Sequence, residues 1–354
     1  MEKKMKQFFI DLVEAPSPSG FEQPAQEVYR NFIGKYADEV KTDVHGNVIA
    51  LKKGTSDLRL MLVGHADEIG LMVNYIDDNG FVRFVPIGGV DVALLPGTRV
   101  NIYHNGQLVR GVIGRKAIHL LQPEERKVAP KLEDLWIDIG ASNREAAEKR
   151  VGIGDAITFS PGLEELEGGV ITSKATDNKA GVYVVAAVMK ELAKEEIACN
   201  LYSVAAVQEE VGLRGAKTSA FGIDPHVGIA IDVTHATDFP GMNKNVLGDI
   251  RLGFGPVIAV GCNINPKVFE LLKKAGDKAK VKYQIEAAPR GTGTDANALQ
   301  VNRAGVATGL ISIPNRYMHT QNEVIHLEDL AAAAKLLAEF ARQIDNTTDF
   351  IPKV

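Results

Sequence analysis

The sequence predicts an α/β fold with a mainly parallel central sheet flanked by helices, interrupted by a small β-rich domain. Two observations predict this arrangement. Short apolar runs alternate with helical patterns in the first and last parts of the chain, which is typical of a parallel sheet covered on both faces. Between them, in residues 70–163, glycines separate short apolar runs and long helical patterns are nearly absent, which is typical of a compact β domain.

Residues 1–69 are expected to form the first part of the α/β domain. Apolar side chains at helical spacing predict a helix over 3–14, and a second helix is expected over 22–36. The period then changes, because 47–52 and 58–63 are short apolar runs bounded by glycine and polar residues. These two runs predict strands.

Residues 70–163 are expected to form the inserted β-rich domain. The segments 81–86, 99–103 and 108–113 are short apolar runs set off by glycines, and they predict strands. The stretch 122–131 is charged and is expected to be a loop.

Residues 164–354 are expected to complete the α/β domain, because the alternation of strand and helix patterns returns there. Helices are expected over 180–192, 212–221, 266–279, 295–303 and 327–344, and strands over 201–207, 227–231 and 305–313. We find no internal repeat and no low-complexity linker in the sequence.

The bulk composition excludes several classes of protein. With 45% hydrophobic and 24% charged residues, the chain is typical of a globular protein, and its formal charge of -5 argues against a nucleic-acid partner. Two cysteines imply no disulfide framework and indicate a reducing compartment. No run of about 20 apolar residues is present to span a membrane, and the first residues lack a signal-peptide pattern. We therefore expect a cytoplasmic protein.

Histidine and acidic side chains follow four of the predicted strands. In open α/β sheets, the ligand crevice lies at the carboxyl ends of the strands, so side chains far apart in sequence can converge there. The side chains at these positions are His65, Glu209, Glu210, Asp232 and His319. We expect them to lie close together.

A further acid, Asp177, stands just before the apolar helix expected over 180–192. Sets of histidine and carboxylate ligands suit zinc, with cobalt and manganese as substitutes. Two such ions about 3.5–4 Å apart, bridged by one carboxylate, form the clamp found in two-metal hydrolases. The number of candidates fits this clamp, with one shared aspartate and, for each ion, one histidine and one further carboxylate.

Each candidate also has a simpler interpretation. Asp177 alone is more typical of a helix cap, and Asp232 of an Asx-turn that ends a strand. A single histidine is more often hydrogen-bonded than metal-bound, and the Glu209-Glu210 pair is compatible with solvated acids. Their joint occurrence at strand ends favours the metal site.

At these positions the chain resembles the TET-type metallo-aminopeptidases. This family includes glutamyl and deblocking aminopeptidases, and some members carry the older label endoglucanase. The resemblance covers almost the whole chain in the family's order, and its matching stretches are 64–70, 86–91, 176–179, 208–216, 230–234, 291–296 and 316–320. It implies a zinc-peptidase-like fold for the α/β domain.

The resemblance also implies two divalent metal ions per chain, zinc or else cobalt or manganese. His65, Asp177 and Asp232 would hold one ion. Asp177, Glu210 and His319 would hold the other, so that Asp177 bridges the pair.

The resemblance assigns the reaction as well. It implies an aminopeptidase that hydrolyses N-terminal residues from peptides with a water that bridges the two metals. Glu209 would be the general base, and Asp67 would hold the His65 imidazole in its orientation. The inserted domain would be a dimerisation domain, and the dimers would assemble into a homo-oligomeric dodecamer.

Other functions stay open at this point. A two-metal deacylase or carboxypeptidase would use similar ligands, and an inactive scaffold could keep the fold, although no ligand position is lost. Glycoside hydrolysis is disfavoured because no separate acid pair is present. Substrate preference is expected to depend on 290–297 and the loop around Cys262 and Asn263. There, Arg290 either pairs with acidic substrates or is an ordinary exposed arginine outside the pocket.

Overall fold

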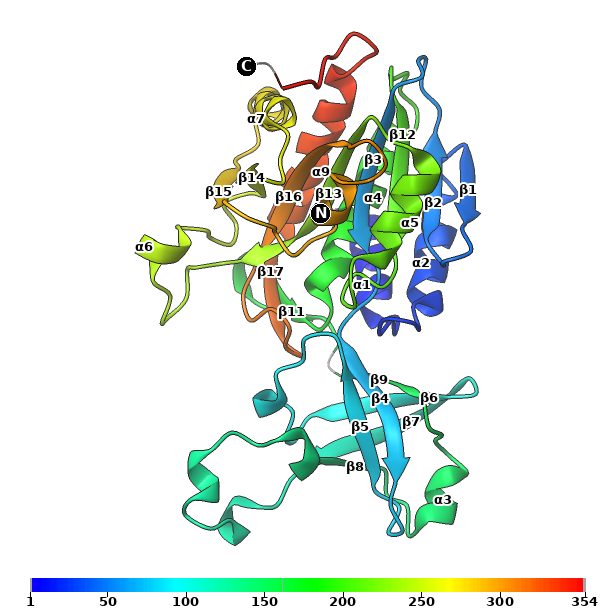
Figure 1. The fold of residues 1–354 in the computed structure, drawn as a ribbon, viewed down its shortest axis with the longest axis vertical. Helices are drawn as coiled ribbons and strands as arrows, with labels where there is room; N and C mark the ends of the chain where they lie inside the picture. Colours follow the sequence, from blue (N-terminus) through cyan, green and yellow to red (C-terminus); the bar gives the residue numbers. More distant parts are fainter. Residues whose placement is uncertain (1, 161, 353–354) are drawn as a thin grey trace.

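The computed structural model describes residues 2–160 and 162–352. Figure 1 shows a large body, in which helices cover a sheet, and a smaller body of strands joined to one end of it. Within the described residues, no helix is both long enough and apolar enough to cross a membrane.

An extended sheet forms the centre of the large body. Its strands are β1 (Glu39–Thr42), β2 (Val48–Lys52), β3 (Arg59–His65), β12 (Asn200–Ala206), β13 (Val227–His235), β14 (Val257–Gly261), β15 (Gln284–Ala288) and β16 (Ala307–Asn315). Their order is β1-β2-β12-β3-β13-β16-β14-β15. The neighbours β12, β3, β13 and β16 are parallel, whereas β1, β2 and the β14–β16 pair add antiparallel contacts toward the edges. The predicted central sheet flanked by helices is confirmed.

Helices cover both faces of this sheet. On one face lie α1 (Lys3–Glu14), α2 (Gln23–Ile33), α4 (Thr176–Leu192), α7 (Pro266–Ala279) and α9 (Leu327–Gln343). The other face carries α5 (Arg214–Ile223) and α8 (Ala296–Leu299). In β13, Ile229 and Ile231 pack toward the first face and Ala230 toward the second. Burial on both faces explains why the central strands are continuous apolar runs.

The helix expected over 295–303 is shorter than predicted. Only Ala296–Leu299 is helical, and the chain then turns through Arg303, whose φ of 47° is left-handed. A left-handed residue cannot continue a right-handed helix, so the helix cannot extend through Arg303 as expected.

Helix α4 lies directly against the sheet because two glycines allow it. A Cβ on Gly64 would lie 2.5 Å from the backbone of Gly181, and a Cβ on Gly181 would lie 2.5 Å from the carbonyl oxygen of Ile231. Only glycine permits so close an approach of two backbones. The contact holds the start of α4, and with it Asp177, beside the ends of β3 and β13.

The smaller body is a closed barrel with its own core. Its strands are β4 (Gly70–Ile76), β5 (Val82–Ile87), β6 (Arg99–His104), β7 (Gln107–Gly114), β8 (Trp136–Asp138) and β9 (Ala156–Phe159), and α3 (Arg144–Glu148) packs beside them. Ile102, Ile137 and Ile157 are fully buried in the centre of the barrel. The segment 122–131 lies in the connection between β7 and β8 and contains only one short helical turn. The barrel falls inside the segment 70–163, and closure removes free sheet edges.

A small antiparallel sheet lies at the end of the large body nearer the barrel (Figure 1). It consists of β10 (Glu164–Glu165), β11 (Val170–Ser173) and β17 (Glu323–His326). β11 leads into α4, and β17 follows the segment that contains His319. This sheet therefore fixes two chain segments that carry candidate site residues. The short helix α6 (Lys244–Leu247) lies away from it, beyond β13.

Candidate active site

The candidate residues predicted to converge do lie together at the carboxyl ends of the central strands. His65 is the last residue of β3, Glu209 and Glu210 follow β12, and His319 follows β16. Asp232 lies inside β13 and not after its end as expected, because β13 stays paired with β16 as far as His235. A strand end judged from apolar residues alone misses this polar continuation.

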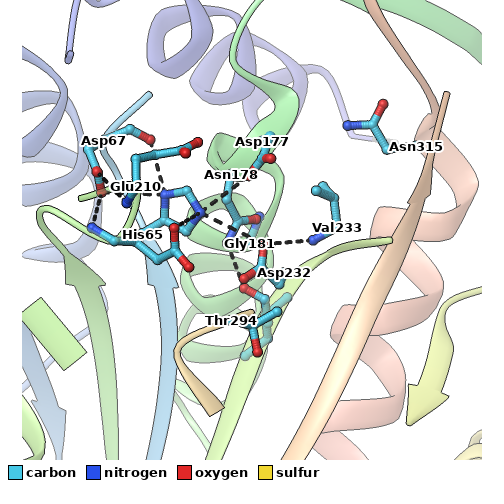
Figure 2. Close-up of polar contacts among 12 residues, drawn as sticks. His65, Asp67, Asp177, Asn178, Gly181, Glu210, Asp232, Val233, Thr294 and Asn315 are labelled. Carbon is cyan, nitrogen blue, oxygen red and sulfur yellow. Dashed lines mark hydrogen bonds and ion pairs between the residues drawn. The ribbon is translucent and has the colours of Figure 1, made fainter. Parts of the chain in front are cut away.

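Asp177 lies between the two histidines. Its Oδ1 is 3.2 Å from Nε2 of His65, and its Oδ2 is 3.3 Å from Nε2 of His319. It does not cap helix α4: its carboxylate oxygens face the two histidines, and the next residue, Asn178, accepts the Gly181 N–H at 2.8 Å instead. Figure 2 shows Asp177 and Asn178 beside the His65 ring. Both carboxylate oxygens of Asp177 are thus directed at the cluster.

Two groups of ligand atoms, each within 4.8 Å of one another, can hold an ion. One group is His65, Asp177 and Glu210, and the other is His65, Glu209 and Asp232. The family resemblance placed Asp232 with His65 and Asp177, placed Glu210 with Asp177 and His319, and left Glu209 outside both ligand sets. Both neighbouring glutamates therefore reach the cluster, Glu210 with Asp177 and Glu209 with Asp232.

Asp67 organises the loops around this cluster. Its Oδ1 accepts the backbone N–H of Glu209 at 3.0 Å and its Oδ2 accepts that of Glu210 at 3.1 Å. Its Oδ2 also accepts the hydroxyl of Ser19 at 2.6 Å. The carbonyl oxygen of Asp67 lies 3.1 Å from Nδ1 of His65. One buried aspartate thus fixes both the imidazole and the start of the acidic loop.

The hydrogen bonds of the two imidazoles define which nitrogen faces the cluster. Nδ1 of His65 contacts the carbonyl of Asp67, and Nδ1 of His319 contacts the carbonyl of Gly89 at 2.9 Å. A carbonyl oxygen only accepts, so each Nδ1 carries the proton. Nε2 of each ring then faces Asp177: it donates to the carboxylate when the ring is protonated, and it offers its lone pair to an ion when the ring is neutral.

Burial and crowding hold protons on several acids of the cluster. Burial, with a contribution from Asp232, raises the pKa of Glu209 to about 10 against the opposing charge of His65. Burial and the charge of Asp177 raise the pKa of Glu210 to about 8, and burial also raises the pKa of Asp232 to about 8. These acids disfavour one another's charged forms.

The two histidines behave in the opposite way. Burial alone would lower the pKa of His65, but Glu209, Asp177 and Asp67 outweigh it and hold that pKa well above its ordinary value. The bond to Asp177 raises the pKa of His319 to about 9. Protons thus offset a local excess of carboxylates.

This donor set fits divalent metal ions. Carboxylate oxygens and imidazole nitrogens suit zinc and its neighbours in the periodic table. Metal ligands must be deprotonated, and a divalent ion offsets the repulsion among crowded carboxylates in place of protons. The cluster is therefore a good candidate for a metal centre.

Two further acids at the site escaped the sequence analysis. Glu323, at the start of β17, accepts the backbone N–H of Asp177 at 2.9 Å and of His319 at 2.9 Å, so it joins the two segments. Asp295 is 2% exposed, and within residues 2–160 and 162–352 neither of its carboxylate oxygens has a hydrogen-bond partner. Burial raises the pKa of Asp295 to about 7. Asp295 stood in a motif of the family resemblance, whereas no local signal marked Glu323.

A cavity of about 440 Å³ opens from the cluster over the face of the sheet. Its wall is formed by parts of β13, β14, β15 and β16 and by the loop after β15. Arg290 and Thr292 line it. Asn297 instead braces the loop, since its side-chain oxygen accepts the Thr292 N–H at 3.0 Å and also contacts the Asn263 amide.

The barrel also reaches the site. Besides the bond from His319 to Gly89, the side chain of Gln321 donates to the carbonyl of Leu94 at 3.1 Å and to the Thr98 hydroxyl at 3.0 Å. A Cβ on Gly89 would lie 2.9 Å from Nδ1 of His319. The segment after β5 therefore touches the candidate centre directly.

The chain is similar in sequence to known aminopeptidases. The family profile of the M42 glutamyl aminopeptidases matches residues 46–336. The chain is 39% identical over 345 residues to a lysyl aminopeptidase of Pyrococcus furiosus, covering 96% of this chain and 97% of that protein.

Solved structures agree with the sequence comparison. An aminopeptidase of the archaeon Desulfurococcus kamchatkensis has a TM-score of 0.90 at 40% identity, covering 96% of this chain and 95% of that one. The TET1 peptidase of Pyrococcus horikoshii, which can assemble into a tetrahedron or a large octahedral shell, has a TM-score of 0.86 at 31% identity, covering 96% and 100%.

Proposed function

Because the chain belongs to the M42 glutamyl aminopeptidase family and is therefore a peptide-bond hydrolase, we propose that it is a two-metal aminopeptidase that removes N-terminal residues from peptides. The observation that carries the proposal is the position of Asp177, with one carboxylate oxygen facing Nε2 of His65 and the other facing Nε2 of His319. This is the geometry expected of a carboxylate shared between two ions.

The ligands proposed for the two ions share Asp177. One ion would be held by His65, Asp177 and Asp232, and the other by Asp177, Glu210 and His319. When bound, zinc, cobalt or manganese polarises a carbonyl group and makes a water nucleophilic near neutral pH.

Glu209 is the proposed general base. Its carboxylate is buried, and its Oε2 lies 3.7 Å from Nε2 of His65, beside the cluster. A carboxylate so placed takes the proton of the attacking water and passes it to the leaving amine.

A panel of chromogenic substrates tests the function. Metal-reconstituted protein should hydrolyse chromogenic aminoacyl substrates that have a free α-amine. It should not hydrolyse the N-acetylated analogues, and it should not release C-terminal residues from peptides. Hydrolysis of the N-acylated compounds would favour the deacylase, and release of C-terminal residues would favour the carboxypeptidase. Inactivity on all of them with zinc, cobalt and manganese would favour the inactive scaffold.

Elemental analysis tests the metal content. We expect up to two divalent ions per chain after reconstitution, and chelation should abolish hydrolysis while the circular dichroism spectrum stays nearly unchanged. The fold should survive because the two apolar cores are formed without the ions. Protein that retains no ion at micromolar metal concentrations would contradict the two-metal site.

The barrel is proposed as the dimerisation domain of a homo-oligomer, with dimers assembling into a dodecamer in the cytoplasm. In support, the barrel exposes large apolar side chains, among them Ile118, Leu120 and Val128, which are 62%, 65% and 64% exposed. Free cysteines fit a reducing compartment. Replacing these three side chains with serine should lower the mass measured by light scattering. Val44→Ser, at an exposed turn of the large body, is the matched control and should leave the mass unchanged.

A further inference from the structure

Glu286 is an acidic side chain on the cavity wall that the proposed reaction does not use. Outside the candidate metal cluster, three titratable side chains line this cavity, namely His235, Glu286 and Arg290. Of these, Glu286 is the one carboxylic acid. Its position is therefore relevant to which N-terminal side chain the cavity accepts.

The structure holds Glu286 in place from a strand. It lies in the middle of β15 and pairs in register with Ala259 of β14, which also lines the cavity. Both its carboxylate oxygens lie within hydrogen-bond distance of the Thr234 hydroxyl, at 3.1 and 2.9 Å. One hydroxyl supplies a single proton, whereas an ionised carboxylate offers about four acceptor sites. Most of the acceptor capacity of Glu286 is therefore unused.

Glu286 also lacks a counter-charge. Within residues 2–160 and 162–352, no lysine, arginine or histidine forms an ion pair with it. A half-buried carboxylate that faces a cavity and has no cationic partner favours a cation from the ligand. Arg290 lines the same cavity but does not neutralise Glu286.

The distance from the cluster to Glu286 suits a long basic side chain. Thr234 lies two residues beyond Asp232 on the same face of β13, which separates their Cα atoms by about 7 Å. The Glu286 carboxylate contacts Thr234 directly. The four-carbon stem of lysine spans roughly 6 Å. A residue whose carbonyl group lies at the cluster can thus place its ammonium group at Glu286.

Arg290 is less suited to select the substrate. It follows the end of β15 in a loop and is exposed, and among the described residues it forms no hydrogen bond or ion pair. Solvent screens such a charge, and an unheld side chain loses entropy when it binds. The sequence left two possibilities for Arg290, which were pairing with acidic substrates or an ordinary exposed position. Its exposure makes its charge a weaker attraction for a substrate than that of Glu286.

We propose that Glu286 selects peptides with an N-terminal lysine or arginine, by pairing with the ammonium or guanidinium group in the cavity over β13–β16. The proposal rests on the aminopeptidase function proposed above, and it adds the class of side chain that the enzyme accepts.

The variant Glu286→Gln tests it, because the amide keeps the size of the side chain and can still accept the Thr234 hydroxyl. Hydrolysis of lysyl, arginyl, leucyl and glutamyl chromogenic substrates by metal-reconstituted protein should rank lysyl and arginyl first. In the variant, kcat/KM for the two basic substrates should fall by about 10- to 100-fold, the range for losing one charged hydrogen bond. The leucyl value should change little.

Two further variants act as controls. Glu286→Asp retains the charge and should keep the preference for basic residues, which separates loss of charge from a folding defect. Arg290→Gln removes the other charge of the cavity and should leave the ranking unchanged. A ranking that shifts in Arg290→Gln and not in Glu286→Gln would overturn the proposal.

A binding measurement separates this inference from the proposed function. Calorimetric titration should show that free L-lysine binds wild-type protein more tightly than L-leucine does, and that Glu286→Gln removes the difference. If no aminoacyl substrate is hydrolysed, the proposed function fails, and the titration still decides the role of Glu286. Equal binding of lysine and leucine to the wild type would overturn the inference, whatever the activity.

Discussion

The two bodies of the molecule differ in what they bury. In the barrel, the buried polar side chains among residues 70–160 are two threonines, Thr98 and Thr158. The large body buries many charged groups, including Asp67, Glu68 and Lys179. A buried charge is costly unless it is paired or hydrogen-bonded, so the two bodies depend on different interactions for their stability.

Pairing in the large body is extensive. The Glu68 carboxylate contacts Nζ of Lys174 at 2.8 Å and accepts the Ser17 N–H at 2.8 Å. The ammonium group of Lys179 donates to the carbonyls of Leu12 and Ala15 at 2.9 and 2.8 Å. These bonds tie the N-terminal segment to the loop after β3, through Glu68, and to α4, through Lys179. Substitutions that remove a buried charge should therefore destabilise mainly the large body. Substitutions that shrink a buried apolar side chain should destabilise both bodies to a similar extent.

The largest effect should come from the two neighbouring glutamates. Glu209→Gln should retain both ions but lower turnover by about 10²- to 10⁴-fold, the range that general acid–base catalysis supplies. Glu210→Gln should instead lose metal occupancy, because a neutral amide is a poorer ligand, and excess metal should partly restore its activity. Metal content and kcat, measured together, separate the two roles. Exchanged phenotypes would shift the assignment by one residue, and near-normal rates in both would reject the mechanism.

A cavity in either core should cost stability without a large difference between the bodies. Ile102→Ala in the barrel and Leu62→Ala in β3, both at fully buried positions, should each lower the free energy of unfolding by about 2 to 5 kcal/mol. Denaturant titration measures it, and Ile102→Val, at about 0.5 to 1.5 kcal/mol, is the graded control. A negligible effect in the barrel alone would show that its core is loosely packed.

Asp67→Asn removes a buried charge that organises the site without reaching the cavity. We expect metal affinity or activity to fall by about 10- to 100-fold, as is usual when a partner of a metal-binding histidine is changed. Titration of zinc into metal-free protein measures the affinity. Ser19→Ala, which removes only one hydrogen bond to Asp67, should have a smaller effect. If Asp67→Asn binds zinc normally, the Asp67 carboxylate, whose Oδ1 lies 3.4 Å from Nδ1 of His65, does not hold the imidazole, and the backbone carbonyl alone orients the ring.

The smallest effect should come from two ion pairs. Asp238 accepts two bonds from Arg316, at 2.8 and 2.7 Å. Burial alone would raise the pKa of Asp238, but Arg316 and the Leu252 N–H outweigh it and lower that pKa below 3.8. Its stabilising contribution is therefore present above pH 3.8 and is lost as the pH falls through the lowered value.

Asp238→Asn should lower the free energy of unfolding by about 1 kcal/mol at pH 7, and the difference from wild type should vanish in acid. The matched change is Asp78→Asn, which breaks the exposed pair with Arg144 in the barrel. It should have no measurable effect, since solvent screens exposed pairs. Thermal unfolding at several pH values checks both, and a pH-independent loss in Asp238→Asn would exclude the ion pair as the cause.

The sequence predicted elements whose periodicity is strong. The helix expected over 266–279 matches α7, and the buried run 201–207 lies almost entirely in β12. Short strands such as β8 and β17 were missed, because three or four residues carry too little pattern. The fold class needed only the long elements and was therefore predictable.

The site was predictable only where polar residues stand next to apolar runs. His65 and Glu210 have that context, whereas Glu323 belongs to a strand that left no pattern. The cap of α4 shows the limit of local rules, since Asn178 and not its neighbour Asp177 accepts the helix N–H. Glu286 had no signal at all, because its significance comes from a hydroxyl 52 positions away in the chain.

The contact between Gly89 and His319 couples two processes that are usually treated separately. The carbonyl of a barrel segment orients an imidazole of the candidate metal centre. Anything that shifts the barrel against the sheet therefore alters the free energy of ion binding, and thermodynamic reciprocity requires the bound ion to resist that shift by the same amount. A ligand that binds the barrel and resists that shift would thus change the affinity of the centre for its ion, through the contacts of Gly89 with His319 and of Leu94 and Thr98 with Gln321.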